Sequence, residues 1–116
     1  MSSSLAPNDA STSRVNDTYI LDDDGTPQVE PDFDRWLAWM QTHDEPLAET
    51  VVAPGVLVCT RFIGLDQRRT KIGAPVLWET MIFGGPHDLH QARYTSQVAA
   101  LTGHERMMAF AKDQGN

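Results

Sequence analysis

Histidine and acidic side chains are the groups in this sequence that could bind a metal ion or transfer a proton. His87 and His90 are three residues apart beside a turn, and two imidazoles at that spacing can bind zinc when a third ligand joins them. His104 or Cys59 could be that third ligand. The spacing is common in unrelated proteins, and His104 falls on the apolar arc of an expected helix, where a hydrogen-bonded core histidine is the more frequent outcome. We therefore predict no metal site and no cofactor, with His87, His90 and His104 as the alternative ligands.

Glu79 is the carboxylate of greatest chemical interest, because it lies inside an apolar stretch where an unpaired charge is costly. Arg61, across the strand ladder, and Arg93, beyond the next turn, are its expected partners. We favour a structural Glu–Arg pair that joins the strands over an acid–base catalytic role. The sequence has no Ser-His-Asp pattern, and Gly84-Gly85 is too short for a phosphate-binding loop. No catalytic residue is predicted.

Two other candidate groups favour structural roles. Asp22, Asp23 and Asp24 would need further oxygen ligands at set positions to form a calcium loop, and the sequence lacks that pattern. The Asp-Gly step that follows is typical of a turn, which is the interpretation we favour. Cys59 is the only cysteine, so an internal disulfide is excluded and nothing points to secretion. We expect Cys59 to be a small buried hydrophobe within a strand.

Charge is unevenly distributed along the 116 residues, whose formal net charge is −7. Residues 1–49 contain eleven acidic and two basic side chains, a net charge of −9, and residues 50–116 contain five acidic and seven basic ones, a net charge of +2. Binding to phosphate backbones needs a broad basic face, so direct nucleic-acid binding is not expected. Arg68, Arg69 and Lys71 form the only basic cluster. A solvated loop is its usual explanation, and contact with an acidic partner is the alternative.

Trp39 is the aromatic residue that the helical pattern leaves outside the core. Apolar side chains at helical spacing share one face of a helix over about residues 31–43: Phe33, Trp36, Leu37 and Met40. Trp39 lies roughly 110° from the centre of that face, at its rim or in solvent. Tryptophan is a frequent anchor of protein interfaces. Trp39 is therefore a candidate binding residue, and packing at the helix flank is the other interpretation.

The remaining pattern predicts several strands and a second helix. Strands are expected at 18–21, 47–53, 56–63, 76–83 and 89–95, and a helix from 95 or 96 to about 112. Strand 56–63 is largely apolar on both faces, which predicts a central position covered at least partly on both sides. Gly103, in the middle of the second helix, indicates a close crossing over the sheet. The predicted fold class is α+β, an antiparallel sheet of about four or five strands with two helices mainly on one face.

The chain divides into a tail and one domain. Residues 1–17 are polar and lack apolar periodicity, so we expect a disordered tail, followed by a single domain over 18–113. No apolar run approaches the roughly 18 residues of a membrane span. The N-terminal segment also lacks the apolar core of a secretory signal. We therefore expect a cytoplasmic protein that makes no membrane contact.

Five short motifs, in this order, resemble a family of small uncharacterised proteins encoded by bacteriophages and prophages. They occupy residues 19–22, 62–66, 78–86, 93–94 and 103–104. The most specific is Glu-Thr-Met-x-Phe-Gly-Gly, within 78–86, and the resemblance covers about residues 18–110. It implies a phage or prophage setting, and it implies no activity and no functional residue. The chain departs from the family in its polar N-terminal segment and its basic loop.

Three functional hypotheses follow. The leading one is a non-enzymatic accessory protein that binds a host or phage protein, in one version an inhibitor of host defence machinery whose acidic face engages a basic, nucleic-acid-binding surface. The second is a small metal-dependent or acid–base enzyme that uses the three histidines and Glu79. The third is a self-associating structural domain, in which a homodimer hides the second apolar face of the sheet.

Overall fold

The computed structural model describes residues 17–70 and 72–113. The predicted tail, 1–17, lies outside the described residues except for Asp17, and so does Lys71. Strands and helices follow one another as β1 (Tyr19–Leu21), β2 (Pro27–Val29), α1 (Phe33–Thr42), β3 (Ala48–Ala53), β4 (Val56–Phe62), β5 (Trp78–Phe83), β6 (Gln91–Tyr94) and α2 (Gln97–Lys112). The predicted α+β class is confirmed.

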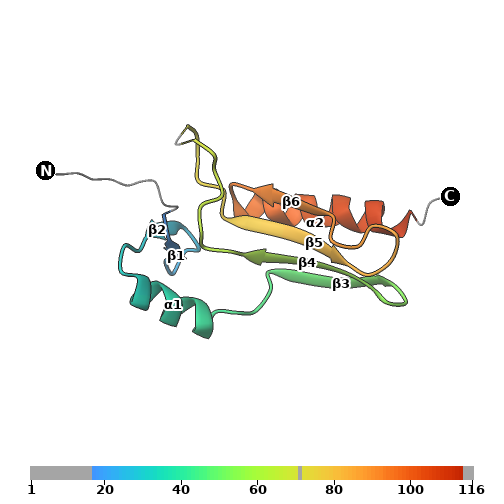
Figure 1. The fold of residues 1–116 in the computed structure, drawn as a ribbon, viewed down its shortest axis with the longest axis horizontal. Coiled ribbons are helices and arrows are strands. Elements are labelled where there is room, and N and C mark those ends of the chain that lie inside the picture. The colour runs from blue at the N-terminus through green and yellow to red at the C-terminus, as the bar shows by residue number, and fades with distance from the viewer. Residues whose placement is uncertain (1–16, 71, 114–116) are drawn as a thin grey trace, which may run out of the picture.

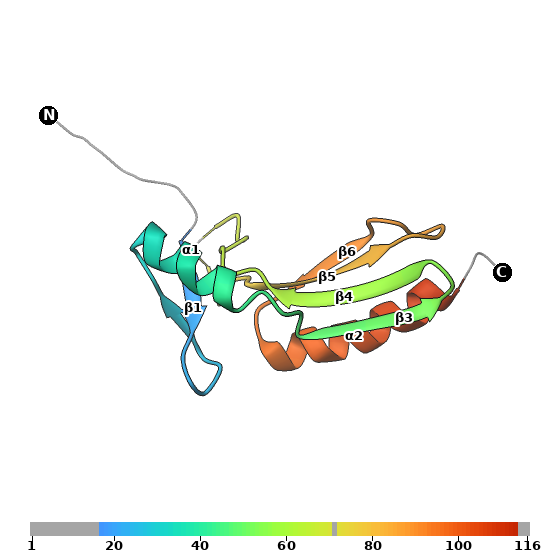
Figure 2. The ribbon, with the colours of Figure 1, turned by 90° about the horizontal axis from the view of Figure 1, so that it is seen from below.

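The main layer is a four-stranded antiparallel sheet in the order β3-β4-β5-β6, with α2 packed along one face (Figure 1). β1 and β2 form a separate hairpin, and α1 packs against β1 at one end of the molecule (Figure 2). Within the described ranges α2 covers one face of β4, while on the other face Cys59 is buried and Arg61 is exposed, so the cover of that second face is partial. The other face, called the open face below, presents side chains of β3 to β6.

Alternating apolar residues of the central strands pack against α2 and form the core. Val58 and Ile82 are opposite each other in the β4–β5 register, and both are fully buried beside Met107. Burial of an aliphatic side chain of this size contributes roughly 1.5–3 kcal/mol. A second cluster of Tyr19, Leu77, Trp78 and Ala100 joins the hairpin to the sheet and to the start of α2.

His104 is buried in this core within a chain of hydroxyl groups. Its Nδ1 is 2.7 Å from Thr60 Oγ1, and its Nε2 is 3.0 Å from Thr50 Oγ1. Thr60 also bonds to Thr80 on the next strand. Desolvation lowers the pKa of the His104 imidazole, and the nearby Glu105 carboxylate opposes that shift only in part. His104 therefore serves as a neutral core residue that links α2 to three strands.

Helix α1 attaches to the rest of the protein through Trp36. The indole Nε1–H is shared between the carbonyl oxygens of Tyr19, at 3.0 Å, and Gly64, at 3.1 Å. The apolar face expected for this helix is not fully buried, since Phe33 and Leu37 remain 58% and 40% exposed. The reason is that α1 contacts a three-residue strand rather than a sheet face.

Candidate functional site

A pocket opens where the β1–β2 hairpin and α1 meet the end of the sheet. Its volume is about 570 Å³, which is within the range of sites that enclose a small molecule or one long side chain. Its walls come from the hairpin turn, the end of α1, the β4–β5 pair and the first turn of α2. The residues that give it chemical character are Asp22, Asp23, Trp39, Glu45, Phe62 and Trp78.

Three aromatic rings form a continuous wall of this pocket. Phe62 and Trp78 are opposite each other in the β4–β5 register, with ring centroids 5.3 Å apart at 64°. Trp39 meets Phe62 edge to face, at 5.9 Å and 79°. Its other neighbour is His43, stacked at 3.9 Å and fixed by a hydrogen bond of 2.8 Å from His43 Nδ1 to the Trp39 carbonyl oxygen. The half-buried Trp39 therefore has a fixed orientation, and its ring lines the pocket.

Acidic side chains occupy the rim. Asp22 is committed to the hairpin turn, because its carboxylate accepts the backbone N–H groups of Asp24 and Thr26. The hydrogen bond from Thr26 is the main cause of the lowered pKa of this carboxyl. Asp23 and Glu45 are exposed, and neither forms an ion pair within the described ranges. These two carboxylates are available to a ligand.

The combination of aromatic wall and acidic rim suits a cation. Among the described residues, no lysine or arginine lines the pocket. A guanidinium or ammonium group is attracted by the faces of aromatic rings and forms strong hydrogen bonds with carboxylates. Among its described lining residues, the Thr42 hydroxyl is 2.9 Å from His43 Nδ1. Both groups donate to the Trp39 carbonyl oxygen, so this imidazole nitrogen carries its proton and cannot act as a base toward the hydroxyl. We therefore interpret the pocket as a binding site.

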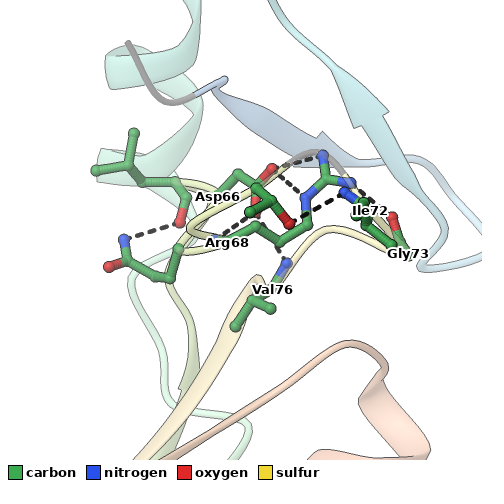
Figure 3. A network of polar contacts seen from close by, with 8 residues as sticks. Asp66, Arg68, Ile72, Gly73 and Val76 are labelled. Atoms are coloured by element: carbon green, nitrogen blue, oxygen red, sulfur yellow. Dashed lines mark hydrogen bonds and ion pairs between the residues drawn. The ribbon is translucent and has the colours of Figure 1, made fainter. Parts of the chain in front are cut away.

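The two described residues of the predicted basic cluster, Arg68 and Arg69, have different environments. Arg68 donates from Nε and Nη2 to Asp66 Oδ2, both at 2.7 Å, and from Nη1 to the Gly73 carbonyl oxygen at 2.6 Å (Figure 3). Asp66 also accepts the backbone N–H groups of Arg68 and Val76. Burial would raise the pKa of the Asp66 carboxyl, but these bonds outweigh it and hold that pKa below its ordinary value. Arg68 thus fixes the 66–76 loop, while Arg69 is exposed.

Glu79 lies on the open face, in a row with Arg61 and Arg93 in the strand register. Arg93 Nε is 3.1 Å from Glu79 Oε2, so these two residues form an ion pair between β5 and β6. Arg61 instead points a guanidinium nitrogen at Cys59 Sγ, at 3.5 Å. The arrangement joins neighbouring strands, and the small pocket of about 220 Å³ beside Arg61 is not lined by Glu79 or Arg93.

The histidines singled out in the sequence lie in two separate places. His87 and His90 both pack their rings on Phe110, at 4.2 and 4.7 Å, and His87 Nε2 donates to the Asp113 carbonyl oxygen at 2.9 Å. His104 is in the core, on the helix side of the sheet, whereas Glu79 is on the open face. No group of three or more His, Cys, Asp or Glu side chains could hold a metal ion within 17–70 and 72–113. The structure therefore does not bring His87, His90, His104 and Glu79 together at one place.

Comparison with known proteins adds no relative. No family model, no curated protein and no solved structure matches the chain. The resemblance to phage proteins accordingly stays a prediction. Among the described helices, none is long and apolar enough to cross a membrane.

Sequence reasoning missed Asp23, Glu45 and Phe62 as site residues. Asp23 falls in the expected turn, and Phe62 falls in the strand expected at 56–63. The signal that could have found the acidic pair is the excess of acidic residues in the first 49 positions, which holds both Asp22–Asp24 and Asp44–Glu45. No local pattern marks Phe62, because its role depends on Trp39 arriving from another element.

Proposed function

We propose that this protein is a non-enzymatic binding protein that captures a basic side chain of a partner protein in the pocket between α1, the hairpin and the sheet. The observation that carries the proposal is the fixed Trp39 ring beside Asp23 and Glu45, two exposed carboxylates that lack partners among the described residues.

Charge beyond the pocket supports a basic partner. The segment up to residue 49 supplies α1, the hairpin and most of the pocket rim, and it carries nine more acidic than basic side chains. Such a field accelerates encounter with a basic surface and disfavours an acidic one. A phage or prophage setting, a cytoplasmic location and a partner from host defence machinery are further parts of the proposal, and they rest on the sequence alone.

A nuclear magnetic resonance titration tests the pocket. The probe is a capped Gly-Arg-Gly peptide, and the comparison peptide carries citrulline, which keeps the shape of arginine and removes its charge. We expect shifts of the Trp39 indole and backbone N–H signals with the arginine peptide and far smaller ones with citrulline. The Asp23→Asn/Glu45→Gln variant should weaken binding about tenfold or more, since each lost charge-assisted contact contributes on the order of 1 kcal/mol.

A matched variant separates the pocket from net charge. Asp34→Asn/Glu105→Gln removes the same two charges from exposed positions of α1 and α2 outside the pocket lining, and it should change binding by less than twofold. Equal weakening by the two double variants, or equal affinity for the citrulline peptide, would show that the pocket is not the binding site.

A further inference from the structure

Strand β3 leaves one edge of the sheet without a partner. It pairs only with β4, and no strand of the described ranges bonds to its outer side. In Figure 1 β3 is the lowest strand, and the view from below in Figure 2 shows its outer edge uncovered by any described element. An edge strand presents backbone N–H and C=O groups that a further strand can bond.

The sequence of β3 lacks two of the features that usually block such an edge. Ala48–Ala53 reads Ala-Glu-Thr-Val-Val-Ala and contains no lysine and no proline. A bulge between Val51 and Ala53 interrupts the ladder only at its end. The central residues Glu49, Thr50 and Val51 are therefore free to pair.

Apolar side chains flank this edge on both faces of the sheet. Val51 is 69% exposed on the open face. On the helix face, Gly103 contacts Tyr94 on β6, and Leu101, two residues earlier and about 160° around the helix, lies on the opposite flank, toward β3. Leu101 is 40% exposed. A strand added at β3 would cover apolar surface above and below it.

We propose that β3 pairs with β3 of a second copy of this chain, antiparallel about a two-fold axis, so that two four-stranded sheets join into one of eight strands. Side chains opposite each other must lie on the same face, which restricts the register to steps of two residues. The register centred on Thr50 places Glu49 opposite Val51 of the partner subunit, and Thr50 opposite Thr50 of the partner subunit, a favourable cross-strand pair.

The neighbouring registers are worse. A shift of two residues in one direction places Glu49 opposite Glu49 of the partner subunit, and like charges in that position are destabilising. A shift in the other direction places Glu49 against the bulge at Ala53 of the partner subunit, where the ladder is irregular. The charge pattern of the strand thus selects one symmetric pairing, which is why the second copy fits better than an arbitrary strand.

Sedimentation equilibrium over a range of protein concentrations tests the pairing. The wild-type chain should form a dimer. Val51→Glu, which faces Glu49 of the partner subunit twice per dimer, should raise the dimer dissociation constant about tenfold. Val51→Lys faces the same carboxylate with a positive charge and should leave the dissociation constant within about twofold of wild type, or lower it.

Val51→Glu and Val51→Lys remove the same apolar side chain, so a difference between their dimer dissociation constants reports whether position 51 faces Glu49 of the partner subunit. The exchange Glu49→Lys/Val51→Glu restores opposite charges and should recover the dimer lost in Val51→Glu. Circular dichroism of each variant checks that the fold is kept. A wild-type chain that stays monomeric at all concentrations would overturn the proposal. So would equal effects of Val51→Glu and Val51→Lys, which would indicate contact through the open face instead of the edge.

Discussion

Gly103→Ala sets two effects of opposite sign against each other. Within a helix, alanine is more stable than glycine by about 1 kcal/mol, so the local preference favours the substitution. In the structure, however, a methyl group at Gly103 would overlap the ring atoms Cε1 and Cζ of Tyr94 and its hydroxyl oxygen. Overpacking of this kind costs typically 1–3 kcal/mol. Tyr94 is half-buried against the cluster around Trp78, so its ring cannot move aside without losing contacts. Because three atoms of Tyr94 overlap the added methyl group, we take the upper part of that range, about 2–3 kcal/mol. After the helical gain of about 1 kcal/mol, we expect the free energy of unfolding to fall by about 1–2 kcal/mol.

A double-mutant cycle measures the overlap directly. Tyr94→Leu removes the three overlapping atoms and keeps an apolar side chain. In that background Gly103→Ala should stabilise the protein by about 0.5–1 kcal/mol, because only the helical preference remains. Urea unfolding followed by circular dichroism gives each value. Thr102→Ala, at an exposed position of the same helix, is the control and should be neutral or slightly stabilising. A Gly103→Ala protein as stable as wild type, or the same sign of effect in both backgrounds, would refute the close contact.

Three further predictions concern buried groups. The pKa of His104 in the folded protein lies below the unfolded value of about 6.5, so its contribution to stability is complete above that pH and is lost as the pH falls through the folded pKa. In urea titrations, the free energy of unfolding should therefore differ less between pH 7 and pH 5 for His104→Gln than for wild type. Asp66→Asn should lower the unfolding midpoint well below that of the exposed control Arg69→Gln, since it removes the counterion of Arg68 and weakens the loop. Equal midpoints for the two variants would show that the Asp66–Arg68 ion pair does not stabilise the loop. Cys59 is 4% exposed, so a thiol reagent should modify it only after unfolding, and rapid labelling of the native protein would contradict its burial.

The elements with strong local signals could be predicted from the sequence. Strands 47–53 and 56–63 around Pro54-Gly55 became β3 and β4, and Ser96 caps α2 by accepting the Ala99 N–H. The close crossing inferred from Gly103 corresponds to the contact with Tyr94. In each case the signal lies within a few residues of the structure that it specifies.

Features that depend on how elements meet could not be predicted. β2 has three residues and begins at Pro27, so its sequence is too short to show an alternating strand pattern. It forms because Asp22 closes the turn before it by accepting the Thr26 N–H. The exposure of Phe33 follows from the position of α1 at the end of the sheet, which periodicity does not encode. The pocket combines segments separated by up to 76 positions, from Leu21 to Gln97, and only tertiary structure brings them together.

The shared hydrogen bond of Trp36 lies at a joint where the pocket can open without unfolding of the whole domain. The indole N–H joins the carbonyl groups of Tyr19 and Gly64, and the Tyr19 N–H donates to the Gly64 carbonyl oxygen at 2.7 Å. Together with the packing of Tyr19 against Leu77, Trp78 and Ala100, these bonds connect the hairpin and α1 to the sheet. Opening this joint would separate the pocket walls while β3 to β6 and α2 stay folded. Such partial opening takes less free energy than global unfolding. The hydrogen-exchange rate of the Trp36 indole proton therefore reports how often the pocket opens. A ligand bound across the joint would slow this exchange.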